Sequence, residues 1–212
     1  MRIRYLGHSC FLITSDNGVS IITDPYHTED DLAYGEITEA ADIVTVSHDH
    51  YDHNNVAAVR GNPQVVRATT RVKGIEFTGT PSYHDDADGR RRGGNTIFCF
   101  EVDGIRLCHL GDLGHCLSVV QVAELGKVDV LFIPVGGYFT IDAATATGVC
   151  NQLQPGLIIP MHWNDKWDVP HVAGVDDFMK GKVDVSRPDA SEIELKSGKL
   201  PAGRITVLKS AL

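Results

Sequence analysis

The sequence predicts an α/β protein built in layers, with helices outside paired β-sheets. The first third of its 212 residues consists of short runs rich in β-branched and aromatic residues, separated by turn formers such as Ser-Asp-Asn-Gly at 15–18. The second half alternates continuous apolar runs with segments of helical period. Strands that come first as a meander and then alternate with helices are typical of layered α/β folds. The sequence contains no repeat, low-complexity segment or linker, so we expect a single domain over residues 1–212.

Strands are expected to dominate the first half of the chain. The run 43–47, Ile-Val-Thr-Val-Ser, predicts a buried strand because it is almost continuously apolar. Residues 36–42 predict a short polar helix or turn, and residues 54–61 a short helix capped by Asn54 or Asn55. The other runs with the composition of strands are 2–6, 10–14, 19–24, 62–69 and 74–83.

The second half adds a hairpin and three helices. Asp103-Gly104 joins two apolar runs as the two-residue turn of a hairpin over 95–112. Helices are predicted at 118–127, ended by Gly126, and at 142–155, capped by Asp142 and followed closely by Pro155. We also expect buried strands at 128–137 and 156–162, a short helix at 174–182, and closing strands at 191–195 and 203–208.

Composition narrows the class of protein. The five cysteines are scattered and form no Cys-x-x-Cys pair, which favours reduced thiols and a cytoplasmic location. A net charge of −9 disfavours nucleic acid as a partner. No apolar run has the length of a bilayer span, so we expect no membrane association. The basic run 89–94 follows four residues rich in aspartate, and predicts a solvated loop with compensating charges, or a contact to a substrate phosphate if it folds over the site.

The segment 47–55 concentrates histidine and aspartate in a spacing typical of a metal site. Its core is His48-x-His50-x-Asp52-His53. Side chains two positions apart in an extended segment face the same way, so His48 and His50 can hold one metal together. Where the chain turns, Asp52 and His53 can face a second metal. Imidazole and carboxylate together suit Zn, Mn, Fe or Co better than Ca or Mg.

Four predicted strands run into a side chain that can bind metal. These side chains are His48, His84, Asp112 and His162. Ligand sites in layered α/β folds gather at the carboxyl ends of strands, so four distant segments could meet at one edge. Their joint occurrence beside the motif predicts a metal site.

The motif and the strand-end residues resemble those of the metallo-β-lactamase superfamily over essentially the whole chain. The resemblance implies a four-layer αββα sandwich. It also implies that His48, His50 and His84 hold a first metal, that Asp52, His53 and His162 hold a second, and that Asp112 bridges them. His109 also precedes Asp112 and is the alternative to His84. The metals would be two divalent ions, with Zn favoured and Mn or Fe as alternatives.

Further segments resemble one branch of that superfamily. Residues 1–13, 21–26, 48–53, 109–115 and 133–142 are similar to simple metal-dependent hydrolases related to ascorbate-6-phosphate lactonase and N-acyl-phosphatidylethanolamine phospholipase D. The resemblance places His8 beside the site. His115 could orient Asp112, touch substrate, or be a packed loop histidine.

The function expected from these residues is hydrolysis of an ester, lactone or phosphodiester of a small molecule. A hydroxide formed on the two metals would attack, and Asp52 would bind metal and hold the hydroxide. No Gly-x-Ser-x-Gly nucleophile motif is present. Two alternatives are a redox di-iron protein, whose relatives carry glutamate in place of His50, and a non-catalytic metal-binding protein. Assembly into a homo-oligomer is left open.

Overall fold

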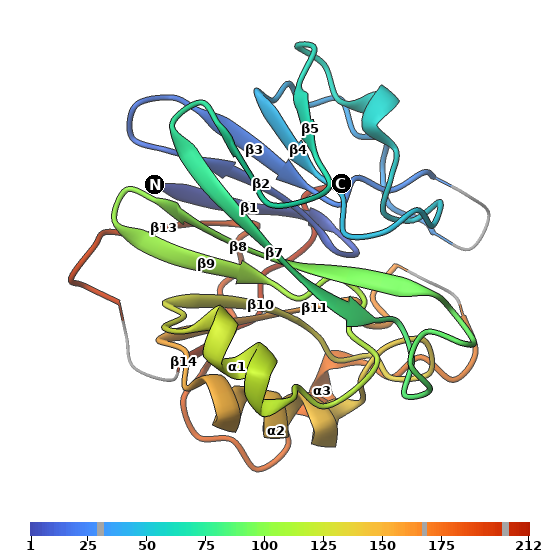
Figure 1. Ribbon diagram of the computed structural model, residues 1–212. Helices are drawn as coiled ribbons and strands as arrows, with labels where there is room; N and C mark the ends of the chain where they lie inside the picture. Colours follow the sequence, from blue (N-terminus) through green and yellow to red (C-terminus); the bar gives the residue numbers. More distant parts are fainter. Residues whose placement is uncertain (29–31, 167–168, 201–203) are drawn as a thin grey trace.

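Two β-sheets packed face to face form the frame of the protein (Figure 1). The computed structural model describes residues 1–28, 32–166, 169–200 and 204–212. The first sheet has the order β13 (Glu192–Glu194), β1 (Arg2–Gly7), β2 (Cys10–Thr14), β3 (Ser20–Thr23), β4 (Ile43–Thr45), β5 (Gln64–Val66). The second has the order β12 (Val185–Ser186), β14 (Arg204–Thr206), β11 (Leu157–Met161), β10 (Val130–Pro134), β9 (Ile105–His109), β8 (Gly94–Val102), β7 (Ile75–Tyr83), β6 (Thr70–Val72).

The alternation of side chains along the strands divides the core into three apolar layers. In β8, Phe98 and Phe100 point between the sheets, while Ile97 and Cys99 point toward the helices. In the first sheet, Ile21 of β3 points between the sheets and its neighbour Ile22 points to the outer face. Because both faces of most strands are covered, the strands carry nearly continuous apolar runs.

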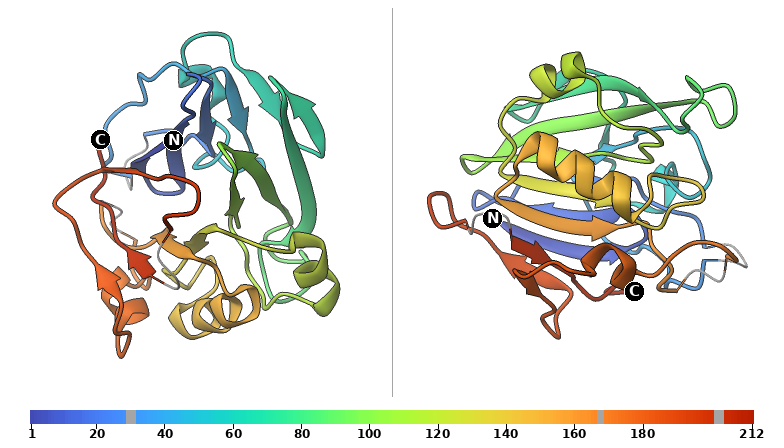
Figure 2. Two further views of the ribbon diagram at one scale, coloured as in Figure 1. Left: turned by 90° about the vertical axis from the view of Figure 1, so that its left-hand side faces the viewer. Right: turned by 90° about the horizontal axis from the view of Figure 1, so that it is seen from below.

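The three α-helices cover the outer face of the second sheet (Figure 2). They are α1 (Val119–Leu125), α2 (Ala143–Leu153) and α3 (Val175–Met179). Ser118 and Gln121 form a capping box at the start of α1, and the Asp142 carboxylate accepts a hydrogen bond from Thr145 N at the start of α2. Within the described residues, no helix is long and apolar enough to cross a lipid bilayer.

The outer face of the first sheet is covered differently. Loop side chains pack on it, including Tyr26, Tyr34 and Ile37, together with Val59, which follows the 3₁₀ turn η1 (Val56–Ala58). The two packed sheets, with helices on the outer face of the second, confirm the predicted α/β sandwich. In the described part of the chain, the layer on this face consists mainly of irregular backbone.

Most predicted elements are present, and the differences are local. Residues 54–61 form the 3₁₀ turn η1 and not an α-helix, and the Asn55 side chain donates to Tyr26 O and does not cap the turn. Residues 36–42 contain no helix, only an isolated bridge at Ala40. The short strands β6 and β12 were not predicted, because two or three residues are too few to show a period. Gly203, at the start of a predicted strand, lies outside the described residues.

The topology brings the carboxyl ends of many strands to one edge. β1 and β3 flank the antiparallel β2 and so run in the same direction, and β4 is parallel to β3. In the second sheet, β7 and β9 flank the antiparallel β8, and β10 and β11 are parallel to β9. The segments that leave these strands therefore meet at the edge of the sandwich.

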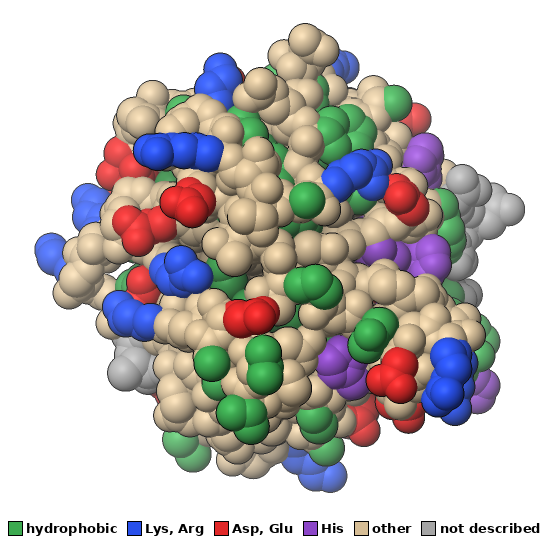
Figure 3. Space-filling view, in the orientation of Figure 1, with side chains coloured by type: hydrophobic (Ala, Val, Ile, Leu, Met, Phe, Trp, Pro, Cys, Tyr) green, Lys and Arg blue, Asp and Glu red, His purple; other side chains and the backbone are tan. Residues whose placement is uncertain are grey.

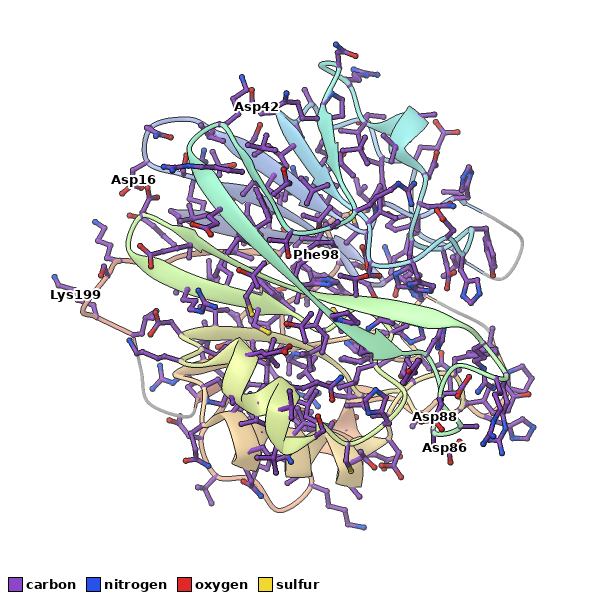
Figure 4. All side chains as sticks on the ribbon, viewed as in Figure 1. Asp16, Asp42, Asp86, Asp88, Phe98 and Lys199 are labelled. Carbon is purple, nitrogen blue, oxygen red and sulfur yellow. The ribbon has the colours of Figure 1, made fainter. Side chains whose placement is uncertain are left out.

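The layer between the sheets should dominate stability. Phe98 is fully buried there, near the centre of the molecule (Figure 4). We expect Phe98→Ala to lower the free energy of unfolding by about 3–5 kcal/mol, because it removes apolar contacts and leaves a cavity. Urea denaturation measures the loss. Val183→Ala, at a fully exposed side chain, is the control and should change stability by less than about 0.5 kcal/mol. Equal effects of the two substitutions would contradict a dominant role for this layer.

Candidate metal centre

The carboxylate of Asp112 lies at the centre of a cluster of histidines. Asp112 follows β9 and is 1% exposed. Its Oδ2 is 3.0 Å from His84 Nε2, 3.2 Å from His162 Nε2 and 3.9 Å from His48 Nε2. Its Oδ1 is 3.1 Å from His53 Nε2. Four imidazoles therefore face one carboxylate. Two come from the segment after β4, and the other two directly follow β7 and β11.

The ligand-type side chains around Asp112 form two groups, and a third set, His48, His53 and Asp112, links them. His48, His50 and His84 form the first group, in which every pair of ligand atoms lies within 4.8 Å. His8, Asp52, His53 and His162 form the second group by the same measure. His50 is exposed, and histidine side chains reach the surface between the two sheets at the right-hand side of Figure 3. The centre is therefore buried at its base and accessible at one side.

His8 contacts both Asp52 and the backbone of His162 within the second group. It directly follows β1, is fully buried, and has a left-handed φ of 54°. Its Nε2 is 3.1 Å from Asp52 Oδ2, and its carbonyl oxygen accepts hydrogen bonds from His162 N and Tyr5 Oη, both at 3.0 Å. The side chain thus holds the Asp52 carboxylate while the backbone holds the start of the segment that carries His162.

Asp24, which was not predicted as a site residue, fixes the orientation of two histidines. Its Oδ2 lies 3.0 Å from His53 Nδ1 and 2.5 Å from Ser47 Oγ. A carboxylate can only accept, so His53 Nδ1 and Ser47 Oγ donate. Ser47 Oγ can then accept from His48 Nδ1, 2.9 Å away. Both histidines consequently turn Nε2 toward Asp112, the arrangement that metal-bound histidines require.

Glycines allow the loops to approach the centre closely. Gly111 has a φ of +53°, and a Cβ there would lie 2.3 Å from Asn95 Oδ1 and 2.7 Å from Ser47 Cβ. Asn95 Oδ1 accepts from Asp112 N at 3.0 Å, so this contact positions Asp112 itself. At Gly136, a Cβ would lie 2.4 Å from the carbonyl oxygen of His162. Neither position has room for a larger residue.

His84, and not His109, lies with the ligand groups. Gly111 N donates to His109 Nδ1 at 3.2 Å, which leaves Nε2 to donate to Ser9 O at 2.9 Å. Both ring nitrogens of His109 are therefore engaged with the backbone. The resemblance alone left the two histidines as alternatives, and their hydrogen bonds distinguish them.

Both ring nitrogens of His115 are engaged with the backbone and not with Asp112. Tyr83 N donates to His115 Nε2 at 3.2 Å, and His115 Nδ1 donates to Cys116 O at 2.7 Å. These bonds make His115 a packed loop histidine. The side chain still lines the cavity beside the centre, so a contact with substrate stays a prediction.

Burial and mutual contact set the charges of the cluster. Burial lowers the pKa of His8 to about 4 and that of His48 to about 3, and the nearby His162 and His53 act in the same direction on His8 and His48 respectively. Burial also opposes the charge of Asp112, but His162, His53 and His84 hold the pKa of that carboxyl well below its ordinary value. His8 and His48 are therefore neutral beside an ionised Asp112, as metal ligands must be, whereas Asp112 raises the pKa of His53 and of His84 against the effect of burial.

The donor set fits divalent metal ions. His53 Nε2 and Asp112 Oδ1 are buried and lie 3.1 Å apart, yet neither forms a hydrogen bond. Buried polar atoms without a hydrogen bond are costly in a native protein unless a ligand satisfies them. Imidazole nitrogens with carboxylate oxygens suit zinc, manganese or iron. The residues that the structure brings together thus have the chemistry of a metal site.

Comparison with known proteins identifies the family. The model of the "Beta-lactamase superfamily domain" matches residues 2–162. The chain belongs to the metallo-β-lactamase superfamily. A crystal structure from Thermotoga maritima, described as a proposed zinc-dependent hydrolase of this superfamily, is 36% identical, with a TM-score of 0.80 over 98% of this chain and 97% of that chain.

Two curated relatives support the same assignment. A metal-dependent hydrolase from Carboxydothermus hydrogenoformans is 32% identical over 80% of this chain and 87% of its own length. One from Thermococcus onnurineus is 28% identical over 85% of this chain and 91% of its own length. With its His/Asp cluster, this member of the superfamily is a metal-dependent hydrolase, as the sequence predicted.

The role of Asp24 can be tested by removing its charge. We expect Asp24→Asn to weaken metal binding about 10- to 100-fold, because His53 and His48 lose the acceptor that fixes their orientation. Competition with a chromophoric chelator measures the affinity. Asp88→Asn is the control, since Asp88 is exposed and shares a left-handed φ that asparagine tolerates. Unchanged affinity in Asp24→Asn would contradict the orienting role.

The lowered pKa of His8 predicts a pH dependence of stability in the chelator-treated protein. Unfolded His8 takes up a proton near pH 6.5, whereas the folded side chain does so only near pH 4. The unfolded state therefore binds more protons between these values, and the contribution of His8 to stability falls as the pH falls from 6.5 to 4. Over that range the stability of wild type should decrease relative to His8→Gln by on the order of 3 kcal/mol. Urea denaturation at several pH values tests this, and parallel curves would contradict it.

Proposed function

We propose that this metal-dependent hydrolase uses two divalent metal ions to hydrolyse an ester, lactone or phosphodiester of a small molecule. The observation that supports it best is that the ligand-type residues form two groups, which Asp112 links through a third set with His48 and His53. His48, His50 and His84 would hold one ion. Asp52, His53 and His162 would hold the other, and Asp112, within 3.0–3.2 Å of histidines from both groups, would bridge them.

When bound, such ions lower the pKa of water to about 7 and polarise an oxygen of the substrate. The chain's own residues provide orientation and charge. Asp24 and Ser47 direct His53 and His48 inward through their hydrogen bonds. His8 Nε2 holds Asp52 Oδ2 at 3.1 Å, which fixes the carboxylate that would bind metal and hold the hydroxide. That carboxylate is anionic, since its contacts with His53 and His8 outweigh burial and hold the pKa of Asp52 well below its ordinary value.

Zinc is the ion we favour, with manganese or iron as alternatives. Six histidines lie within the two groups, and neutral imidazole is a preferred ligand of zinc. The redox di-iron alternative is disfavoured because position 50 is a histidine whose ring lies against His48 at 4.6 Å and His84 at 5.0 Å, where the di-iron relatives carry glutamate. A non-catalytic role is disfavoured by the exposure of His50, which leaves one side of the centre open to substrate.

Metal analysis and a substrate panel test the proposal together. Protein purified in metal-replete buffer should contain about two divalent ions per chain and hydrolyse at least one generic ester, lactone or phosphodiester. The double substitution Asp112→Ala, His162→Ala should lose metal and lower kcat/KM by at least about 100-fold. His171→Ala is the control, since His171 is exposed and belongs to neither group. Wild type without metal, or a double variant with wild-type metal content, would refute the proposal.

A further inference from the structure

The loop 84–93 between β7 and β8 lies beside the metal centre and has a fixed conformation. His84 N donates to Gly93 O at 3.1 Å, so the end of the loop returns to the histidine that begins it. The Asp85 carboxylate accepts from the backbone N–H groups of Ala87, Gly89, Arg91 and Arg92, all at 2.8–2.9 Å. Figure 4 shows Asp86 and Asp88 on this loop, at the lower right of the molecule. The buried Asp85 therefore holds the backbone of the loop in place, including that of Arg91 and Arg92.

Arg92 crosses from this loop to the segment that follows β10. Its guanidinium carbon lies 5.4 Å from the centre of the Phe139 ring, and its side chain is half-buried. Stacking on an aromatic face orients the planar guanidinium and keeps its N–H edge available. Within the part of the chain that the structure describes, Arg92 forms no ion pair with a carboxylate, whereas Arg91 pairs with Asp86 at 2.9 Å. A cation that is partly shielded from water and lacks a counter-ion is a ready binding site for an anion.

Arg92 lines a cavity of about 450 Å³ whose walls continue from the metal centre. Asp85 directly follows His84, and Gly114 comes two residues after Asp112. Three carboxylates share the walls, but each is already engaged: Asp85 by backbone N–H groups, Asp86 by Arg91, and Asp142 by Thr145 N at 2.8 Å. Among the described residues that line the cavity, Arg92 is therefore the charged side chain whose charge no carboxylate compensates.

We propose that Arg92 binds an anionic group of the substrate, a carboxylate or a phosphate, in the cavity between Phe139 and the loop 84–93. The proposal rests on the proposed function, in that the bond to be cleaved would lie at the metal centre. A guanidinium can donate two parallel hydrogen bonds to either oxyanion, which gives both affinity and orientation. The substrate class that results is a small molecule with an anionic group separate from the hydrolysed bond.

Binding of small probes to the metal-loaded protein tests this without relying on catalysis. The probes are butyl phosphate, pentanoate and the neutral pentanamide, titrated by ligand-detected NMR into wild type, Arg92→Gln, Arg92→Leu and Arg90→Gln. The metals would hold a given probe similarly in all four proteins, so the differences between proteins report on the arginines. We expect both Arg92 variants to raise the Kd of at least one anion about tenfold and to leave pentanamide unchanged. Arg90 is exposed on the same loop, and Arg90→Gln should match wild type.

The comparison of anionic and neutral probes distinguishes an anion site from a general loss of binding. The anion that loses more affinity identifies the preferred group. Arg92→Leu keeps apolar packing on Phe139, so it decides the question if Arg92→Gln does not fold. Unchanged anion binding in the folded Arg92 variants, or an equal loss for pentanamide, would overturn the proposal.

If no panel substrate is hydrolysed but anion binding depends on Arg92, the proposed function fails and the anion site stands. If hydrolysis is observed and the Kd of the anions is the same in wild type and in the Arg92 variants, only the proposal of the anion site fails.

Discussion

The contact between one buried carboxylate and four imidazoles is the constraint to which the rest of the structure is adapted. Asp112 is 1% exposed, and a carboxylate so far from water is stable only with charged or hydrogen-bonding partners around it. Those partners come from both sheets: His53 follows strand β4 of the first sheet, and His84 and His162 follow β7 and β11 of the second. The centre therefore connects the two sheets at their common edge. The apolar packing between the sheets sets the distance between the side chains that each sheet contributes.

Three buried residues around the same contact have a strained backbone conformation. His8, Asp24 and His162 are buried, none is glycine, and their φ values are 54°, 37° and 50°. Each directly follows a strand, so the left-handed turn swings its side chain into the space between the sheets. Such conformations cost on the order of 1–3 kcal/mol each and persist only where surrounding contacts enforce them. The bonds of His162 N to His8 O and of Asp24 to His53 and Ser47 are contacts of this kind.

Features that depend on neighbouring residues could be predicted from the sequence. Features that depend on contacts between residues far apart in the chain could not. The hairpin turn at Asp103-Gly104, the end of α1 at Gly126 and the cap at Asp142 follow from adjacent residues, as does the spacing of the histidine motif. The orienting role of Asp24 does not, because it depends on contacts with Ser47 and His53, 23 and 29 positions away. The available signals were its place at the end of a buried strand, beside a proline, and its presence in the segment 21–26 that resembles metal-dependent hydrolases. The choice between His84 and His109 likewise required the hydrogen bond from His109 to Ser9, 100 positions away.

The negative charge of the chain does not conflict with an anionic substrate. The net charge of −9 belongs to the whole surface, and at physiological ionic strength a charge is screened over about 8 Å. What an anion meets in the cavity is set by the nearest groups, and the carboxylates there are each held by N–H donors or by Arg91. The same device operates at the metal centre, where imidazoles surround Asp112. In both places a carboxylate accepts hydrogen bonds or ion pairs that compensate its negative charge. The electrostatic field that a substrate meets therefore comes mainly from charged groups without such a partner, which in the cavity is Arg92.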